Sequence, residues 1–469
     1  MKNIMLEKIS QSDFYKYLEE GFIIEYKEID LKYVDLKNIE VAHFQNCNFT
    51  SSQINFDNSD KGPKLTSMIK KTNISFHNCS FNDLLIMGIN NLGRVNFFNT
   101  EKVKSIKISN SSIDSLIFQN NVAINYKIEI FYCHLLECFD FSKNDFTNKG
   151  IFNLLGNTFY KSSTILNNTF NTLNFTKQYF KELLTFENEF IQDSISSIKE
   201  SEFKKANFNN SNFSNLTLSS CDFLSTTWFE NCRNIDNSEL KFVACEFKGF
   251  SLFNKSKINF LNIDRCTFDK SSSFTDAEFN TLKLFEVKFG GGAYFDEMKI
   301  KKVLDKSYLK SKGEEILEWK RTLRAIKQES QKTENKIDFN NYRNYELAAH
   351  YKELRFCTNF KDTSILWATK WSSDFGNWIW SLFFTLISGF FWYIILYRME
   401  NGVQYDENKI NEFFVGAFRF FLVTDFSNPF KENGSYLINI GSWFIFIFGK
   451  IFIAFGIYEM IQSFRKFKA

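Results

Sequence analysis

The residues best suited to chemistry lie near the C-terminus, where Thr424, Asp425, Ser427 and Asn428 form a short polar stretch. This stretch follows the apolar segment 412–422 and precedes a longer apolar segment. Hydroxyl, carboxylate and amide oxygens can contact a passing ion, and rings of such side chains are one means by which pores select ions. The types and spacing of these residues therefore favour ion coordination over catalysis.

Lys450 is the second notable residue, because it stands beside Gly449 in the middle of the last apolar segment. A charged side chain is costly in hydrocarbon and is expected to face a cavity or a partner. Two interpretations remain open. Lys450 either pairs with a carboxylate of a neighbouring helix or lines an inner cavity or gate with Gly449, where a ring of lysines would repel cations. Asp425 as an outer acidic ring predicts the opposite preference, so the sequence leaves the charge selectivity undecided.

Enzymatic motifs are absent from the sequence, which contains no HExxH, P-loop, GxSxG or paired-carboxylate motif. Its four histidines are scattered along the chain. Lys and Arg total 57 against 54 Asp and Glu, a net charge of +3. This balance argues against a dedicated nucleic-acid-binding surface. We therefore expect no catalytic activity, no metal and no cofactor.

Two segments, at about 377–397 and 437–458, are long and apolar enough to cross a membrane. The basic tail 465–468 then places both termini in the cytoplasm by the positive-inside rule. Between the spans, the stretch at about 411–430 is too short for a third span and too apolar for an ordinary loop. It is expected to form a re-entrant pore loop, because such a helix is tolerated only beside protein or a water-filled cavity. The alternative is a helix lying on the outer leaflet.

Residues 25–300 carry a five-residue hydrophobic period. Neither a helix nor a flat strand produces this period, but a square coil with one inward side chain on each side does. Phenylalanine, 59 of 469 residues, fills many of the repeated positions. The expected inward residues form four runs: Ile29, Val34, Ile39, Phe44, Phe49 and Ile54; Tyr160, Ile165, Phe170, Phe175 and Phe180; Phe203, Phe208, Phe213, Leu218, Phe223 and Trp228; and Phe274, Phe279, Leu284 and Phe289.

Small residues often stand two positions before the inward aromatic ones: Cys47, Cys79, Ser201, Ala206, Ser211, Cys221, Cys245, Cys266 and Ala277. The pattern resembles the pentapeptide-repeat family, whose repeats wind into a right-handed quadrilateral β-helix with both positions pointing inward. The resemblance implies a β-solenoid of thirteen to fourteen turns at ~20 residues per turn. It also implies that these cysteines are small buried hydrophobes. Asn, Ser, Thr and Lys between the apolar positions are expected on the solvated outer face.

Residues 301–372 are predicted to form a helical collar. Segment 313–330 places Ile316, Trp319, Leu323 and Ile326 on one helical face. A second helix is expected at about 341–356, with Tyr345, Leu347, Ala348, Tyr351 and Leu354 as its apolar positions. The pair either only covers the solenoid end or also couples the solenoid to the spans. A basic cluster where the repeats end is a candidate contact for a polyanionic ligand, or a solvated face near lipid headgroups: Lys301, Lys302, Lys306, Lys310 and Lys312.

The order of span, short apolar helix, polar stretch and span resembles the pore segment of the potassium-channel superfamily, as do the pairs 417–418 and 423–424. The Thr-Val-Gly-Tyr-Gly filter of that superfamily is absent. The flanks 372–376 and 458–466 look like those of bacterial pentapeptide-repeat proteins that end in a two-span channel module. The resemblance implies an ion channel of the bacterial inner membrane, made of several copies of the chain and by family of four.

The resemblance further implies regulation of the channel by its cytoplasmic part, through a nucleotide, an oligonucleotide or a partner protein. Membrane depolarisation in anti-phage defence is the implied role. The alternative function is a non-conducting, membrane-anchored solenoid that binds a protein partner. The expected organisation is an N-terminal cap (1–24), the repeat β-helix (25–300), the helical collar (301–372) and the pore module (373–469).

Overall fold

The structure is a computed structural model that describes residues 7–31, 33–34, 39–50, 54–57, 71–100, 104–124, 127–354, 359–402, 410–430 and 436–465. The chain forms two compact units, Met1–Asp305 and Lys306–Ala469.

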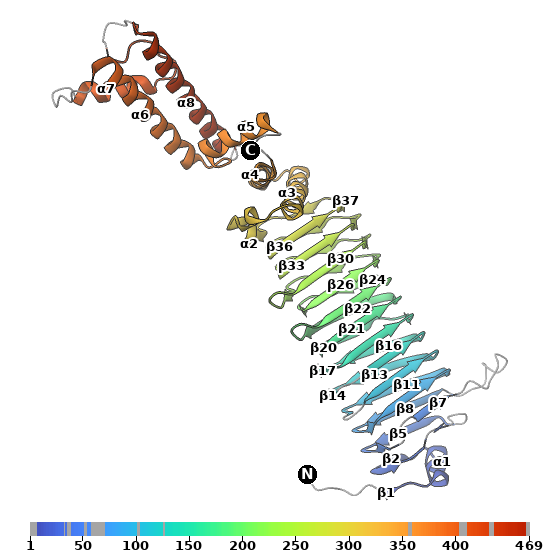
Figure 1. Ribbon diagram of the computed structural model, residues 1–469. Coiled ribbons are helices and arrows are strands. Elements are labelled where there is room, and N and C mark those ends of the chain that lie inside the picture. Colours follow the sequence, from blue (N-terminus) through green and yellow to red (C-terminus); the bar gives the residue numbers. More distant parts are fainter. Residues whose placement is uncertain are drawn as a thin grey trace. The chain divides into compact units, whose positions relative to one another are not determined.

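The first unit is a β-solenoid of about 12 turns, seen in Figure 1 as stacked short strands. Its strands pair in parallel with strands of the next turn. Four strands of one turn show the pattern: β26 (Asn215–Ser219) pairs with β30 (Glu239–Val243), β27 (Asp222–Phe223) with β31 (Glu246–Phe247), β28 (Thr227–Trp228) with β32 (Ser251–Leu252), and β29 (Arg233–Asn234) with β33 (Lys257–Asp264). Four ladders per turn confirm the expected β-solenoid with a four-sided cross-section.

The turns are longer than the five-residue period predicts, which is why fewer turns form than expected. Ile198 pairs with Leu218, an offset of 20 residues, but Leu218 pairs with Phe242, an offset of 24 residues. Extra residues at the corners shift the inward position along the chain. Tyr160, expected inside, is 45% exposed, and Trp228 is only half-buried. The adjacent residues Phe159 and Phe229 are buried instead.

The other predicted inward residues that the structure describes are buried, and the side chain of Ile54 lies outside the described part. Phenylalanines of successive turns stack face to face in columns. One column has ring centroids 4.5–5.2 Å apart and comprises Phe180, Phe203, Phe223, Phe247, Phe268 and Phe289. Such contacts add about 0.5–1.5 kcal/mol per pair beyond burial of the rings. The repeated slot accounts for the abundance of phenylalanine.

The small positions lie at corners of the solenoid. The residue before most of them has a left-handed backbone, as in Asn46 (φ 52°), Asn78 (φ 52°) and Asn210 (φ 59°). Asparagine tolerates this conformation better than other non-glycine residues. The small side chain then donates to the carbonyl two residues earlier, as Ser201 Oγ does to Lys199 O at 2.8 Å. The corner geometry therefore favours Asn before the slot, as at Asn46, and allows a hydroxyl within it to bond to the chain, as at Ser201.

The cysteines expected in small positions are buried. Cys133 and Cys232 occupy equivalent corners, and burial raises the pKa of their thiols to about 11 and about 12, respectively. These thiols are therefore protonated at neutral pH and are poor nucleophiles. The eight cysteines that the structure describes are free.

A column of buried amides runs through the middle of the solenoid and corrects the expectation that its asparagines lie on the outer face. Asn121, Asn144, Asn168 and Asn188 are each at most 2% exposed. The side-chain Nδ2 of each of the first three donates to the Oδ1 of the asparagine in the next turn, at 2.7, 3.0 and 2.8 Å along the column. The same amides donate to main-chain carbonyls of the preceding turn. Continuous hydrogen bonding makes this buried polar column tolerable.

Helices border the first and last turns of this unit. Helix α1 (Gln11–Glu19) buries Phe14 and Leu18, and the Phe14 ring stacks on Phe44 at 6.1 Å. At the other end, the short helix α2 (Lys301–Leu304) buries Val303. Apolar side chains from these helices therefore cover core positions that a terminal turn would expose.

The second unit begins with the 3₁₀ turn η1 (Ser307–Lys310) and the hairpin of α3 (Glu314–Lys332) and α4 (Lys336–Glu353). The predicted inward face of α3 is confirmed, because its four apolar residues are buried. On α4 the expected apolar positions are half-buried, and the fully buried residues are Tyr342, Glu346 and Ala349. Glu346 turns inward because Arg324 Nε and Lys327 Nζ of α3 lie 2.8 and 2.6 Å from its carboxylate.

Four further helices complete the described part of the second unit: α5 (Phe360–Ser373), α6 (Trp378–Asn401), α7 (Ile410–Phe421) and α8 (Ile440–Arg465). Helix α5 was not anticipated as a separate element. It leaves Ile365, Trp367 and Trp371 more than half exposed. Exposed tryptophans on a helix just before an apolar helix are typical of a membrane–water interface.

Candidate functional site

Helices α6 and α8 are each long and apolar enough to cross a membrane. They contain most of the predicted spans 377–397 and 437–458 and continue four and seven residues beyond them. Within one chain, only 28% of the α6 window and 33% of the α8 window are buried. The remaining surface is largely apolar, so these helices require lipid or other protein around them.

Helix α7 packs against both α6 and α8. The hydroxyl of Tyr393 on α6 donates to Phe413 O at 2.7 Å, near the start of α7. A Cβ at Gly416 would lie 2.4 Å from that hydroxyl, so only glycine allows this approach. At the other end of α7, the Phe421 ring lies 2.3 Å from a Cβ built on Gly389 of α6. Helix α7 therefore follows α6 from Tyr393 toward Gly389, in the direction of the α6 N-terminus.

Lys450 closes the C-terminal end of α7. Its side chain is 4% exposed, and its Nζ donates to Leu422 O at 2.5 Å and to Arg419 O at 3.4 Å. The ammonium also lies 5.5 Å and 5.0 Å from the ring centroids of Phe420 and Phe446. Among the residues that the structure describes, its hydrogen-bond partners are thus main-chain carbonyls rather than the carboxylate considered from the sequence. A cation is well placed at the negative end of a helix dipole.

Gly449 has a packing role in this arrangement. A Cβ on Gly449 would lie 2.4 Å from Phe420 Cζ and 2.9 Å from Trp392 Cβ. The missing side chain therefore lets α6, α7 and α8 meet at one point. In a single chain this residue faces neighbouring side chains, and its part in an inner cavity or gate stays a prediction.

The C-terminal end of α7 lies level with the middle of both apolar helices. Lys450 is ten residues from the start of α8, about 15 Å along its axis. Gly389, which contacts Phe421, is eleven residues from the start of α6, about 16 Å along that axis. With α6 and α8 in a bilayer, the end of α7 and the polar stretch after it would lie near the midplane.

The four polar residues after α7 have different environments. Thr424 is exposed and Asp425 half-buried. Ser427 is held by Asp425, whose Oδ1 accepts hydrogen bonds from Ser427 N at 2.9 Å and from its Oγ at 2.5 Å. Asn428 is 3% exposed, and its Oδ1 accepts from Phe430 N at 2.9 Å. Thr424 and Asp425 can therefore face an ion, while Ser427 and Asn428 shape the loop.

The predicted basic cluster is divided between the two units. Lys301 and Lys302 belong to α2 of the first unit, where the Lys302 ammonium lies 5.6 Å from the Phe260 ring centroid. Lys306 and Lys310 line a cavity of the second unit, and Lys312 is not among its lining residues. Lys352 and Lys370 line the same cavity but were not found from the sequence, because they are distant from the cluster along the chain. Only a tertiary contact brings them together.

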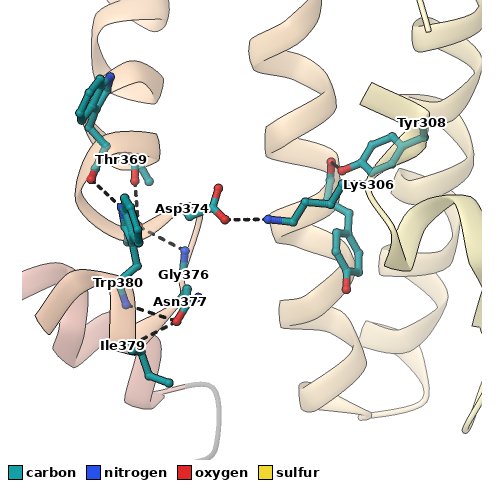
Figure 2. A network of polar contacts seen from close by, with 11 residues as sticks. Lys306, Tyr308, Thr369, Asp374, Gly376, Asn377, Ile379 and Trp380 are labelled. Atoms are coloured by element: carbon teal, nitrogen blue, oxygen red, sulfur yellow. Dashed lines mark hydrogen bonds and ion pairs between the residues drawn. The ribbon is translucent and has the colours of Figure 1, made fainter. Parts of the chain in front are cut away.

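The turn between α5 and α6 borders this cavity, and Figure 2 shows the polar contacts of this turn. Lys306 Nζ pairs with Asp374 of this turn at 2.6 Å. Asn377 Oδ1 caps α6 by accepting from Ile379 N at 3.1 Å, and Trp380 Nε1 donates to Trp371 O at 2.9 Å. Asp374 and the next residue both have left-handed backbones, with φ of 42° and 60°. A turn with two left-handed residues thus connects α5 to α6, and the Lys306–Asp374 ion pair links this turn to the residue before η1.

Comparison of the sequence with models of known protein families gives no match, and comparison with curated proteins gives no relative. The resemblances to the pentapeptide-repeat family and to two-span channels therefore rest on the residues quoted above. A β-solenoid followed by helices, two of them long and apolar enough to span a membrane, is the architecture that the structure shows.

Proposed function

We propose that the chain forms a homo-oligomeric ion channel in the bacterial inner membrane. The main support is the position of the α7 C-terminus beside the middle of both apolar helices, where it contacts Lys450 of α8 and Gly389 of α6. Irregular backbone at this depth is unfavourable in lipid and is tolerated where it lines a water-filled cavity or is buried in protein. The exposed Thr424 and half-buried Asp425 follow directly at this depth, and a water-filled pore would accommodate both.

Several copies of the chain are needed, because two spanning helices cannot enclose a pore. The low burial of α6 and α8 in one chain leaves surface for neighbouring copies as well as for lipid. Helix α7 also has an apolar face that its own chain leaves uncovered, including Phe414, Phe418 and Leu422. We propose four copies, the number that the resemblance implies.

Asp425 and Lys450 give the pore opposite fixed charges at the same end of α7. Lys450 offsets the partial negative charge of the helix end by binding two of its carbonyls. Asp425 is then the acidic residue within the polar stretch that would line the pore. We propose that the two side chains act against each other on ion selectivity.

Planar bilayers containing the purified full chain test this function. Conductance is expected, and Asp425→Ala is expected to shift the reversal potential in a salt gradient toward the anion equilibrium potential. Asp362→Asn, an exposed acidic residue of α5, is the matched control and should leave the reversal potential unchanged. Absence of conductance under all ligand conditions would contradict the channel and favour the non-conducting, membrane-anchored solenoid.

We further propose that the cytoplasmic part controls the channel, and that depolarisation in anti-phage defence is its role. A regulator acts only through different affinities for the open and closed states. Expression in bacteria of the full chain and of a form lacking residues 1–300, with membrane potential and growth followed over time, tests the control. Equal depolarisation by both forms under every condition would contradict it.

A further inference from the structure

The second unit contains a cavity of about 410 Å³, lined by both charged and aromatic side chains, that no function discussed so far uses. Three segments line it: Lys306 with the following η1 and its Lys310, helix α4 with Tyr345 and Lys352, and the end of α5 with the following turn. A volume of this size accommodates a small ligand rather than a few waters. The cavity includes Asn377, which caps α6, so a ligand bound there would contact the start of the first apolar helix.

The charges of the cavity are strongly unbalanced. Four lysines line it, namely Lys306, Lys310, Lys352 and Lys370, against the single lining carboxylate of Asp374. Asp374 is already paired with Lys306 at 2.6 Å. In the part of the chain that the structure describes, no carboxylate forms a salt bridge with Lys310, Lys352 or Lys370. Three lysines that share one cavity, with no carboxylate partner among the described residues, favour a ligand that carries more than one negative charge.

Aromatic and amide groups form the rest of the wall. Tyr345, Tyr351 and Phe375 line the cavity together with Asn341 and Asn344. The Lys370 ammonium lies 5.2 Å from the centroid of the Tyr351 ring, which holds that ammonium at the cavity edge. Rings beside lysines suit a ligand in which a phosphate is joined to an organic group.

We propose that this cavity binds a phosphate-bearing ligand, with its phosphate oxygens on the lysines and its organic part against the tyrosines. The bound phosphate would compete with Asp374 for the Lys306 ammonium. Release of Asp374 would free the left-handed turn that begins α6, because the Lys306–Asp374 pair holds that turn against η1. Ligand binding would thereby change the position of the first apolar helix.

The same phosphate chemistry has two sources, a soluble organic phosphate and the headgroup of an anionic phospholipid. Trp371 and Trp378, which flank the lining turn, are exposed as expected near a membrane interface. Both sources can therefore reach the cavity, and the experiment separates them.

The test uses the full chain in phosphatidylcholine nanodiscs, titrated with pyrophosphate and with adenosine monophosphate in a calorimeter. A second arm compares hydrogen exchange of residues 341–352 and 370–377 in nanodiscs with and without phosphatidylglycerol. Saturable binding in the first arm identifies a soluble phosphate. Protection that appears only with phosphatidylglycerol identifies a headgroup.

The double variant Lys352→Gln and Lys370→Gln is expected to weaken binding in the responding arm about tenfold or more, because it removes two charged hydrogen-bond donors. Lys312→Gln with Lys361→Gln, two exposed lysines outside the cavity, is the control and should change binding less than about twofold. The single variant Lys310→Gln replaces the double variant if that one fails to fold. No saturable response in either arm, or equal losses in the cavity and control variants, would overturn the proposal.

The site itself does not depend on conductance, but its effect on α6 as a gate rests on the proposed channel. If phosphate binds and no current is seen, the cavity stands and the channel fails. If current is seen and no phosphate binds, the channel stands and the cavity proposal fails. If both are seen, the bound phosphate should change the open probability of the unsubstituted chain and not that of the double variant.

Discussion

Both the solenoid and the membrane module bury polar groups, but the partners of those groups differ. In the solenoid, Asn144 bonds to the same residue type one turn on and to a carbonyl one turn back. In the membrane module, the ammonium of Lys450 bonds to the carbonyls of one helix end. The solenoid therefore satisfies its buried amides by repetition, whereas the membrane module (α6, α7 and α8) holds α7 by hydrogen bonds from Tyr393 and Lys450 and has a largely uncovered apolar exterior. The comparison indicates that the solenoid satisfies its buried amides within one chain, while α6 and α8 leave apolar surface for lipid or protein to cover.

The largest expected effect is on the stability of the solenoid, when one of its stacked phenylalanines is removed. Phe208 is fully buried, and its ring stacks on Phe229 at 4.7 Å. Phe208→Ala should cost about 3–5 kcal/mol of unfolding free energy through loss of burial and a residual cavity. Hydrogen exchange of the neighbouring turns in the full chain measures it. Lys204→Ala, on an outer face with a side chain 52% exposed, should be nearly neutral, and an equal effect would contradict the inward assignment.

The anchor of the membrane module should show the next largest effect. Lys450→Met leaves two main-chain carbonyls without their donor at mid-helix depth. Loss of both hydrogen bonds should destabilise the docking of α7 by about 2–4 kcal/mol. Faster hydrogen exchange of residues 410–421 in nanodiscs would report it. Ser442→Ala is the control, since the buried Ser442 hydroxyl has no hydrogen-bond partner among the described residues. Equal exchange in both variants would show that Lys450 does not anchor α7.

The asparagine column offers a smaller test of the hydrogen bonding between successive turns. Asn144→Ala removes the acceptor of Asn121 and the donor to Asn168. Buried groups left without partners should cost about 2 kcal/mol. Asn174→Ala is the matched control, because the Asn174 amide is less buried and bonds to Asn153 on a solvated side. If both variants lose the same stability by thermal unfolding, the buried column is not a special contributor.

The smallest effect concerns the α3–α4 hairpin and its response to pH. Burial would raise the pKa of Glu346, but hydrogen bonds from Lys327 and Arg324 outweigh burial and lower it below the ordinary 4.5. The ionised carboxylate therefore stabilises the hairpin above pH 4.5, and this contribution is lost as the pH falls through the lowered pKa. Hydrogen exchange of residues 314–353, corrected for its intrinsic pH dependence, should accelerate in acid. Glu346→Gln should lack this pH dependence, and an unchanged response in that variant would exclude Glu346 as the cause.

The solenoid was predictable because inward side chains recur at a nearly constant spacing that a single sequence displays. The prediction went wrong at Tyr160 and Trp228, where corner insertions shift the inward residue by one position and leave no periodic signal. The buried amides were missed because asparagine stands both before the small slot, as at Asn46, and within it, as at Asn144. Only tertiary stacking distinguishes these two uses.

The candidate site was less predictable, because its partners are main-chain atoms and distant residues. The sequence shows that Lys450 needs a partner, but a carbonyl at the end of α7 has no sequence signature. Likewise, Lys352 and Lys370 join Lys306 only after α4 and α5 fold beside η1. The order of the apolar segments, by contrast, was visible because a span and a short helix differ in length.

The parallel stacking of the turns has a consequence for biosynthesis. A typical turn pairs with the chain 20–24 residues before it, so each new turn can fold onto a template that has already left the ribosome. Helix α1 covers the core of the first turns, onto which later turns stack, since its Phe14 ring stacks on Phe44. Helix α6 begins only at Trp378, and domains generally fold as units in the order of their synthesis. We expect the solenoid to be folded before the first apolar helix reaches the membrane. A folded rod cannot be threaded through a translocation channel and would therefore remain on the side of the membrane where it was made.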